Sequence, residues 1–315
     1  MGVLQVGLFG SVRITHNNWV TEVIMTREIQ ALLAYLLLQR HRIHARESLA
    51  GIFWGEQSQE RARGSLNTAL WKLKKALEPK GIPAGTYLKS TRPGDIGFNR
   101  ESQYWLDVEI LEGGVNRILI YPFQTVEETY VIDLEKVLGL YKGELLEAFY
   151  DDWALRERER LRALYLKGMI YLLQYYGFHR EYEKAIAYGQ QILGLDPLRE
   201  EIYRDMMRLY LENGQRALAL RQYAICRLTL DKELGISPME DTQVLYTQIF
   251  TGGKRSSTPI ISHEQISFDQ ALRQLREASH TIDLAKEQIQ QAIQLIAKYS
   301  EHSDSGFASK ANGNG

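Results

Sequence analysis

The sequence predicts a mainly α-helical protein with a small β part near its amino terminus. Residues 3–25 alternate apolar and polar positions and contain β-branched residues, which is typical of a small antiparallel sheet. From residue 105 onward, apolar residues recur at helical spacing in segment after segment, separated by short turns. Charge divides the chain in the same way: residues 1–104 hold 14 Lys and Arg against 8 Asp and Glu, whereas the remainder holds 24 against 31.

Composition narrows the class of protein. The 315 residues leave room for two or three domains, and 44% hydrophobic with 24% charged residues is usual for a soluble globular chain. One cysteine, Cys226, cannot form an internal disulfide, and a buried apolar role is expected for it. Residues 1–11 do not form a secretory signal, and the longest apolar run, residues 31–38, is too short to cross a bilayer. We expect a cytoplasmic location with no membrane partner.

The first part is expected to contain three helices and a hairpin after the sheet. Thr26 is a plausible N-cap for a helix over residues 27–39, a second short helix ends at Gly55, and a third covers residues 59–78. Residues 87–90 and 96–99 form a hairpin around the turn at residues 93–95. A sheet, three helices and a terminal hairpin in this order make a winged helix-turn-helix, expected over residues 1–104.

The third helix carries the candidate binding residues. Leu66, Leu70, Leu73 and Leu77 form one apolar stripe, which leaves the opposite side free. That side combines cations, which suit phosphates, with amide and hydroxyl groups, which suit base edges in a DNA major groove. Two alternatives stay open: a solvated basic helix face, and a plain surface turn in place of the wing. The candidate DNA-binding residues are Arg61, Arg63, Asn67, Thr68, Lys72, Lys74 and Lys75 on the helix and Lys89 and Arg92 on the wing.

The second part is expected to be an α-solenoid with the pitch of a tetratricopeptide (TPR-like) repeat, over residues 105–250. Its helices are predicted at residues 127–140, 153–176, 182–193, 199–213, 216–230 and 241–250. Residues 110–124 are interpreted as irregular. Residues 251–262 are a linker by their Gly, Ser and Pro content, and residues 301–315 form a polar tail that we expect to be disordered.

An apolar seam follows the linker. From Phe268 to Ile296, residues step by four and three through four heptads, which predicts an amphipathic helix over residues 263–300. The seam is weakened by Ser279 and Lys286. Two assignments stay open for it: a coiled coil that makes a homodimer, and a helix that lies on the solenoid of its own chain.

Two sets of residues carry a resemblance to a known family. In the first part they are Arg27, Ala31 to Leu36, Arg46 to Leu49, Phe53, Trp54, Ala62, Arg63, Leu66, Ala69, Leu70 and Leu73 to Leu77. In the second part they are Leu140, Tyr141, Gly143 to Leu146, Trp153, Asp196 to Leu198, Glu200, Met207, Tyr210, Gly214, Ala219, Leu220, Tyr223, Leu230, Glu233 to Gly235, Pro238, Thr242, Leu245 and Tyr246. The chain resembles the SARP transcriptional activators, in which an OmpR-type winged helix precedes a bacterial transcriptional activation domain.

The chain departs from this family on the third helix. The family tends to carry Arg where this chain has Lys72, Lys74 and Lys75, and a small or polar residue where it has Trp71. Because Lys makes a poorer bidentate contact to guanine than Arg, we assign the lysines to phosphates. Base reading is assigned to Asn67 and Thr68, with Arg63 as a third candidate. Trp71 is not in the set, because packing against the sheet is an alternative role for its ring.

The resemblance implies a bacterial, sequence-specific transcriptional activator that binds direct repeats in promoter DNA and contacts RNA polymerase and a second copy of itself. We find no spaced catalytic triad, phosphate loop or metal-ligand cluster, so we expect no enzyme activity, no cofactor and no metal. The alternative is a helical-repeat adaptor or sensor whose winged helix serves protein–protein interaction. Retention on duplex DNA, lost steeply as salt is added, distinguishes the two.

Overall fold

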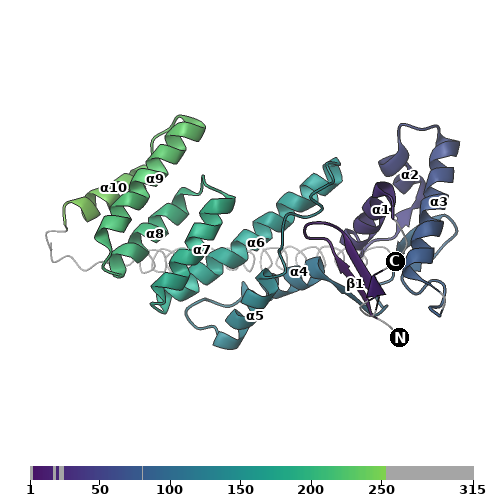
Figure 1. Ribbon diagram of the computed structural model, residues 1–315, viewed down its shortest axis with the longest axis horizontal. Coiled ribbons are helices and arrows are strands. Elements are labelled where there is room, and N and C mark those ends of the chain that lie inside the picture. The colour runs from purple at the N-terminus through teal and green to yellow at the C-terminus, as the bar shows by residue number, and fades with distance from the viewer. Residues whose placement is uncertain (1–2, 17–18, 21–24, 80, 253–315) are drawn as a thin grey trace, which may run out of the picture. The chain divides into compact units, whose positions relative to one another are not determined.

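The computed structural model describes residues 3–16, 19–20, 25–79 and 81–252, and the predicted linker, amphipathic helix and tail lie outside these ranges from residue 253 onward. The described part confirms the predicted fold class, a small β part followed by a long succession of helices (Figure 1). Residues up to Gly252 form one compact unit.

Two small sheets frame the amino-terminal region. The first has the order β3-β2-β1-β7, in which β1 pairs with β2 antiparallel and with β7 parallel, and the second has the order β4-β6-β5. The sequence predicted the antiparallel strands and the hairpin but not β7, which places Trp105 and Leu106 in the first sheet. The strands are β1 (Leu4–Gly7), β2 (Arg13–His16), β3 (Trp19–Val20), β4 (His44–Ala45), β5 (Leu88–Lys89), β6 (Asp95–Phe98) and β7 (Tyr104–Leu106).

Three helices complete the winged helix-turn-helix: α1 (Arg27–Leu38), α2 (Arg46–Trp54) and α3 (Gln59–Leu77). Thr26 stands at the N-cap of α1, and its carbonyl accepts hydrogen bonds from the N–H groups of Ile29 and Gln30, although its side chain makes no cap bond. The leucine stripe of α3 is buried as predicted and faces α1 and α2. Its buried residues are Ala62, Leu66, Ala69, Leu70, Leu73, Ala76 and Leu77.

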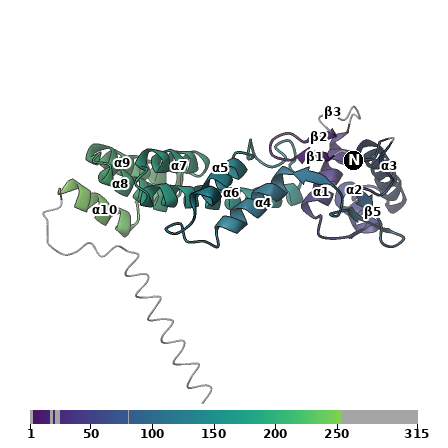
Figure 2. The same ribbon diagram turned by 90° about the horizontal axis from the view of Figure 1, so that it is seen from below.

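Seven helices follow within the described residues. Each of α6 to α9 packs on the next helix in the chain, which makes a succession of helix pairs in which α6 lies beside α7 and α8 beside α9 (Figures 1 and 2). None of the described helices is long and apolar enough to span a membrane. The helices are α4 (Asp107–Ile118), α5 (Glu128–Leu138), α6 (Asp152–Phe178), α7 (Tyr182–Leu195), α8 (Glu200–Glu212), α9 (Arg216–Leu234) and α10 (Glu240–Phe250).

The interpretation of residues 110–124 as irregular is wrong for their first half, because α4 runs to Ile118. Gly113 and Gly114 each lower helix propensity by about 1 kcal/mol relative to Ala, which is why the sequence suggested a break. Burial compensates, since Val108, Leu111, Val115 and Ile118 lie on one face and are almost fully buried. Gly114 also has a packing role: a Cβ there would lie 2.8 Å from the side chain of Val137 on α5.

The winged helix is joined to the helical region by backbone pairing. Phe9 forms a β-bridge with Leu145, the N–H of Gly10 donates to the carbonyl of Glu144 at 2.8 Å, and the N–H of Leu146 donates to the carbonyl of Leu8 at 3.0 Å. The buried guanidinium of Arg158, on α6, holds this segment by donating to the carbonyls of residues 145, 146 and 149. The segment directly after β1 is therefore fixed to the loop before α6.

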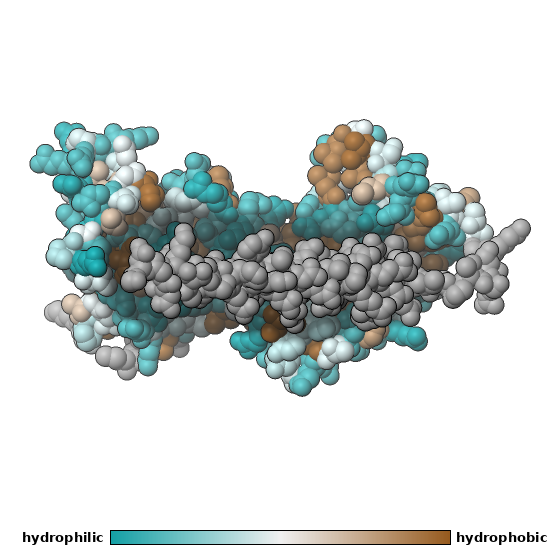
Figure 3. Space-filling model, turned by 180° about the vertical axis from the view of Figure 1, so that it is seen from behind, coloured by the Kyte–Doolittle hydropathy of each residue, from teal (hydrophilic) through white to brown (hydrophobic). Residues whose placement is uncertain are grey.

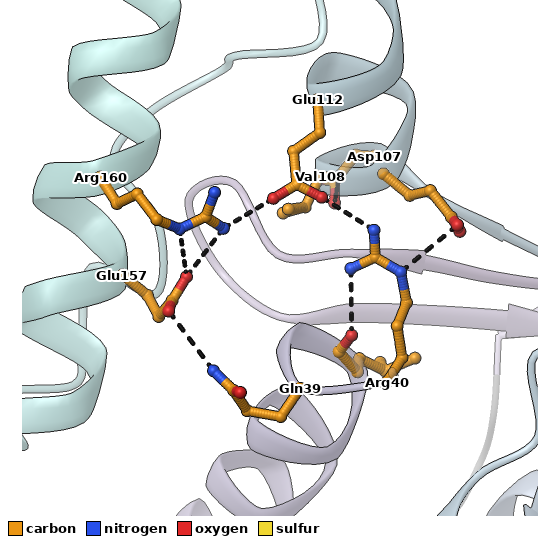
Figure 4. A network of polar contacts seen from close by, with 9 residues as sticks. Gln39, Arg40, Asp107, Val108, Glu112, Glu157 and Arg160 are labelled. Atoms are coloured by element: carbon orange, nitrogen blue, oxygen red, sulfur yellow. Dashed lines mark hydrogen bonds and ion pairs between the residues drawn. The ribbon is translucent and has the colours of Figure 1, made fainter. Parts of the chain in front are cut away.

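A polar network extends this junction (Figure 4). Glu112 on α4 accepts hydrogen bonds from two guanidinium groups, Arg40 after α1 at 2.8 Å and Arg160 on α6 at 2.6 Å. Arg160 also pairs with Glu157 at 2.8 Å, and Glu157 accepts a hydrogen bond from Gln39 at 3.4 Å. Because the side chains of Arg40 and Glu112 are only 12% and 19% exposed, their pair is poorly screened by solvent.

Candidate nucleic-acid interface

The candidate residues on α3 lie on the side of the helix that faces away from the core. Arg61, Arg63, Asn67, Thr68, Lys72 and Lys75 are exposed and Lys74 is half-buried. Glu60 in the first turn and Glu78 at the C-cap are the carboxylates that α3 itself carries, and Glu78 turns inward. It accepts hydrogen bonds from the N–H groups of Gly85, Tyr87 and Leu88 at 2.8 to 3.2 Å. Apart from the indole of Trp71, the exposed face between the two ends of α3 is consequently cationic and uncharged-polar.

Asn67 and Arg63 are oriented by the start of α2. The Nη1 of Arg46 donates to the Oδ1 of Asn67 at 3.3 Å, and the Nη2 of Arg63 lies 3.5 Å from the Oε1 of Glu47. Because Arg46 engages the Oδ1 of Asn67, the NH₂ group of this amide is left as the donor, and a purine N7 or O6 can accept a hydrogen bond from it. Arg63 is partly neutralised by Glu47, although both side chains are more than half exposed.

Thr68 and Arg61 belong to the opposite flank of α3. The hydroxyl of Thr68 donates to the carbonyl of Gly64 at 3.0 Å, which leaves the oxygen free to accept. Arg61, Thr68 and Lys72 line a surface groove of about 960 Å³, which α3 forms with residues at the start of α1 and the end of α2. The candidates on α3 therefore divide into two flanks, with Asn67 and Arg63 on one and this group on the other.

The wing is a tight turn built around one carboxylate. Asp95 accepts hydrogen bonds from the hydroxyl of Thr91 at 2.6 Å, the N–H of Thr91 at 2.8 Å and the N–H of Arg92 at 3.0 Å. These hydrogen bonds, that of the Thr91 hydroxyl first, hold the pKa of Asp95 below its ordinary value. Gly94, at φ +89°, supplies the left-handed backbone that the turn needs. Arg92 is exposed, whereas Lys89 is 35% exposed and lies 3.7 Å from Glu101.

Arg46 is a candidate that the sequence did not single out as a binding residue. Its backbone N–H donates to the carbonyl of Gly94 at 2.9 Å, so it connects the wing to α2, while its side chain reaches Asn67. A hollow of about 470 Å³ lies between Arg46 and wing residues 90–94. The Nε of Arg46 is buried and has no hydrogen-bond partner within the described part of the chain. Only the pairing of β4 with β6, distant in sequence, reveals this arrangement.

The alternative role for Trp71, packing against the sheet, is wrong. Its side chain is 61% exposed and lies on the outer face of α3, where the ammonium of Lys75 sits 5.1 Å from the ring centroid. The apolar stripe of α3 is completed without it. Among the described residues, no group of three or more His, Cys, Asp or Glu side chains could hold a metal ion.

Comparison with known proteins agrees with this architecture. Residues 124–250 match the family described as "Bacterial transcriptional activator domain". The chain is 25% identical over 239 residues to Transcriptional regulatory protein MoaR1 of Mycobacterium tuberculosis, covering 71% of this chain and 72% of that protein. It is 26% identical over 253 residues to Transcriptional regulator RedD of Streptomyces coelicolor, covering 75% and 67%.

A longer relative and a solved structure are also similar. Regulatory protein AfsR of Streptomyces coelicolor is 26% identical over 256 residues, which are 79% of this chain but only 24% of AfsR. The solved structure of Mycobacterium tuberculosis EmbR in complex with low affinity phosphopeptide has a TM-score of 0.62 at 20% identity, covering 87% of this chain and 72% of that one, and shows the likeness of fold. The domain match and the named relatives together make this chain similar to the SARP-type bacterial transcriptional activators and support that type of protein.

Proposed function

We propose that this chain is a sequence-specific DNA-binding activator that reads direct repeats in promoters through α3 and its wing. The supporting observation is the convergence of exposed cations on one surface. Arg61, Lys72, Lys74, Lys75 and Arg92, among which Lys74 is half-buried, make no ion pair within the described part of the chain, and Arg46 lines a hollow with Arg92. About six such contacts to phosphates imply that affinity falls by roughly a thousandfold between 50 and 200 mM salt.

Within this surface we assign different roles to neutral and charged side chains. Asn67 and Thr68 read base edges, because Asn67 keeps the NH₂ group of its amide and Thr68 keeps the acceptor lone pairs of its hydroxyl oxygen for this contact. Lys74 and Lys75, about two turns further along α3, bind phosphates as point charges. Arg46 orients Asn67 through the hydrogen bond that its guanidinium donates to the amide oxygen of Asn67. Arg92 and Lys89 extend the contact to the backbone or minor groove beside the site of α3.

The helical region is proposed to make the protein contacts, with a second copy of the chain and with RNA polymerase. Its support is a group of large apolar side chains that are 50% to 67% exposed in the second half of α9 and the segment after it: Leu228, Leu234, Ile236 and Met239. On the face drawn in Figure 3, hydrophilic residues cover most of the described surface, and the hydrophobic areas are separated from one another by hydrophilic residues. Pairing two winged helices raises apparent affinity for a repeated site by effective concentration.

The test is a selection of bound fragments from random duplex DNA with the full chain, followed by affinity measurements on the selected site at several salt concentrations. Asn67→Ala should reduce the preference for the selected site over random DNA. Lys74→Ala should weaken both DNAs alike and lower the salt slope by about one. Equal behaviour of the two variants would contradict the division of roles. No retention on DNA at low salt would favour the adaptor or sensor alternative.

A further inference from the structure

Trp71 is an exposed indole for which the fold provides no use. Its side chain is 61% exposed, while Trp54, Trp105 and Trp153 are half-buried. The one ring contact recorded for it in the described part of the chain is the ammonium of Lys75 at 5.1 Å. Exposing an indole forgoes the stabilisation that burial of its apolar area would bring, and Trp is also a weaker helix former than Ala. The surface position of Trp71 therefore calls for a role outside folding.

The place of Trp71 on α3 associates it with the proposed DNA surface. At about 100° per residue, it lies one turn beyond Asn67 and Thr68 and one turn before Lys75, on the line of the helix farthest from the core. No carboxylate occurs on α3 between Glu60 and Glu78. A surface of lysines around the indole favours a polyanion as its partner.

Gly64 makes room on the same line, two turns earlier. A Cβ built there meets no atom within 4 Å, so no packing contact in the protein requires a glycine. The outer line of α3 thus carries an open notch at Gly64 and a large apolar side chain at Trp71. Another chain or a duplex can approach the helix closely at the notch and contact the indole beyond it.

The chemistry of the duplex identifies what the indole contacts. In the major groove, the C5 methyl of thymine is the apolar group that base pairs present, and the other readable groups are hydrogen-bond donors and acceptors. We propose that Trp71 packs its indole on the C5 methyl of a thymine and so specifies that base, an inference that rests on the proposed DNA-binding function. Lys75, over the ring, restricts the ring's orientation and keeps its own charge near the phosphates.

The experiment removes the methyl group and the indole separately. The site selected by the full chain is synthesised with each thymine replaced in turn by deoxyuridine, which keeps base pairing and removes only the methyl. Affinities are measured by fluorescence anisotropy at fixed salt. For the native chain, one replacement should weaken binding by about fourfold, the equivalent of one buried methyl group. Trp71→Ala should bind the thymine and uracil sites equally.

Matched variants make the outcome specific. Trp71→Phe should retain part of the discrimination because it keeps an apolar ring. Asn67→Ala should retain the full thymine preference although it loses overall specificity. Trp71→Ala should leave the salt slope unchanged, since no phosphate contact is removed. Because Trp71 is mostly exposed, its variants should keep the native thermal melt, which serves as the folding control.

The inference and the proposed function fail in different ways. If the native chain selects a site but no uracil replacement matters, or if Trp71→Ala keeps the same thymine preference as the native chain, the inference is overturned while DNA binding stands. An indole that served a protein contact would give this result. If the native chain does not bind any site in preference to random DNA, the proposed function is overturned and the inference with it.

Discussion

Glu112→Ala should destabilise the protein by roughly 2–3 kcal/mol. The glutamate joins Arg40 and Arg160, but the two pairs are not equal. Arg160 is 47% exposed and keeps its ion pair with Glu157, so the loss of its pair with Glu112 should cost well under about 1 kcal/mol of stability. Arg40 is only 12% exposed and keeps Glu109 at 3.3 Å, yet it loses a charge-assisted hydrogen bond of about 1.5–3 kcal/mol.

The assay is thermal and urea unfolding of the full chain. For a unit of this size the loss corresponds to a fall in Tm of roughly 5–10 °C. Glu101→Ala is the matched control, because Glu101 is 87% exposed and pairs with Lys89 at 3.7 Å, so its removal should change stability by less than about 0.5 kcal/mol. If Glu112→Ala cost no more than Glu101→Ala, the junction would not depend on this network and the reasoning would be refuted.

Three further predictions concern single groups. Gly64→Ala should stabilise the chain by about 1 kcal/mol in urea unfolding while weakening binding to its selected site, and a loss of stability would show that the notch has a packing role. The Asp95 carboxyl should titrate by NMR with a pKa below its ordinary value of about 3.9. Because the pKa is lowered in the folded state, the wing should stay ordered above the ordinary pKa and lose order as pH falls through the folded pKa. Thr91→Ala should raise the pKa of Asp95, because it removes the hydroxyl hydrogen bond. Burial raises the pKa of Cys226 to about 12, so the thiol should resist a disulfide reagent at pH 8 until the protein is unfolded, and rapid native labelling would contradict its burial.

The sequence was most informative where hydrophobic periodicity was strong. The leucines of α1 and α3 recur at helical spacing over three turns or more, and the structure places both helices within a residue or two of the predicted bounds. The wing was predictable because residues 93–95 combine Pro, Gly and Asp in one turn. These are local signals, which a single sequence contains in full.

Long-range packing decided what the sequence could not predict. Strand β7 pairs with β1 across about a hundred residues, and no local pattern records such a parallel contact. The glycines of α4 suggested a break, although close packing on α5 favours a small residue there. Arg46 reached the candidate site only through the pairing of β4 with β6. The exposure of Trp71 likewise depends on packing, because the leucines and alanines of α3 already complete the buried face of this helix. The assignment of individual residues to DNA stays a prediction.

The position of Asp107 has a practical consequence for dissecting the protein. Its carboxylate accepts hydrogen bonds from the N–H groups of Leu8 and Phe9 at 2.8 to 3.0 Å, and it begins the first helix after the wing. A fragment cut directly behind the wing would contain every proposed DNA contact, yet it would leave two buried amide donors at the end of β1 without acceptors. A fragment that is to be studied alone must therefore extend through β7 and include Asp107 at the start of the helical region.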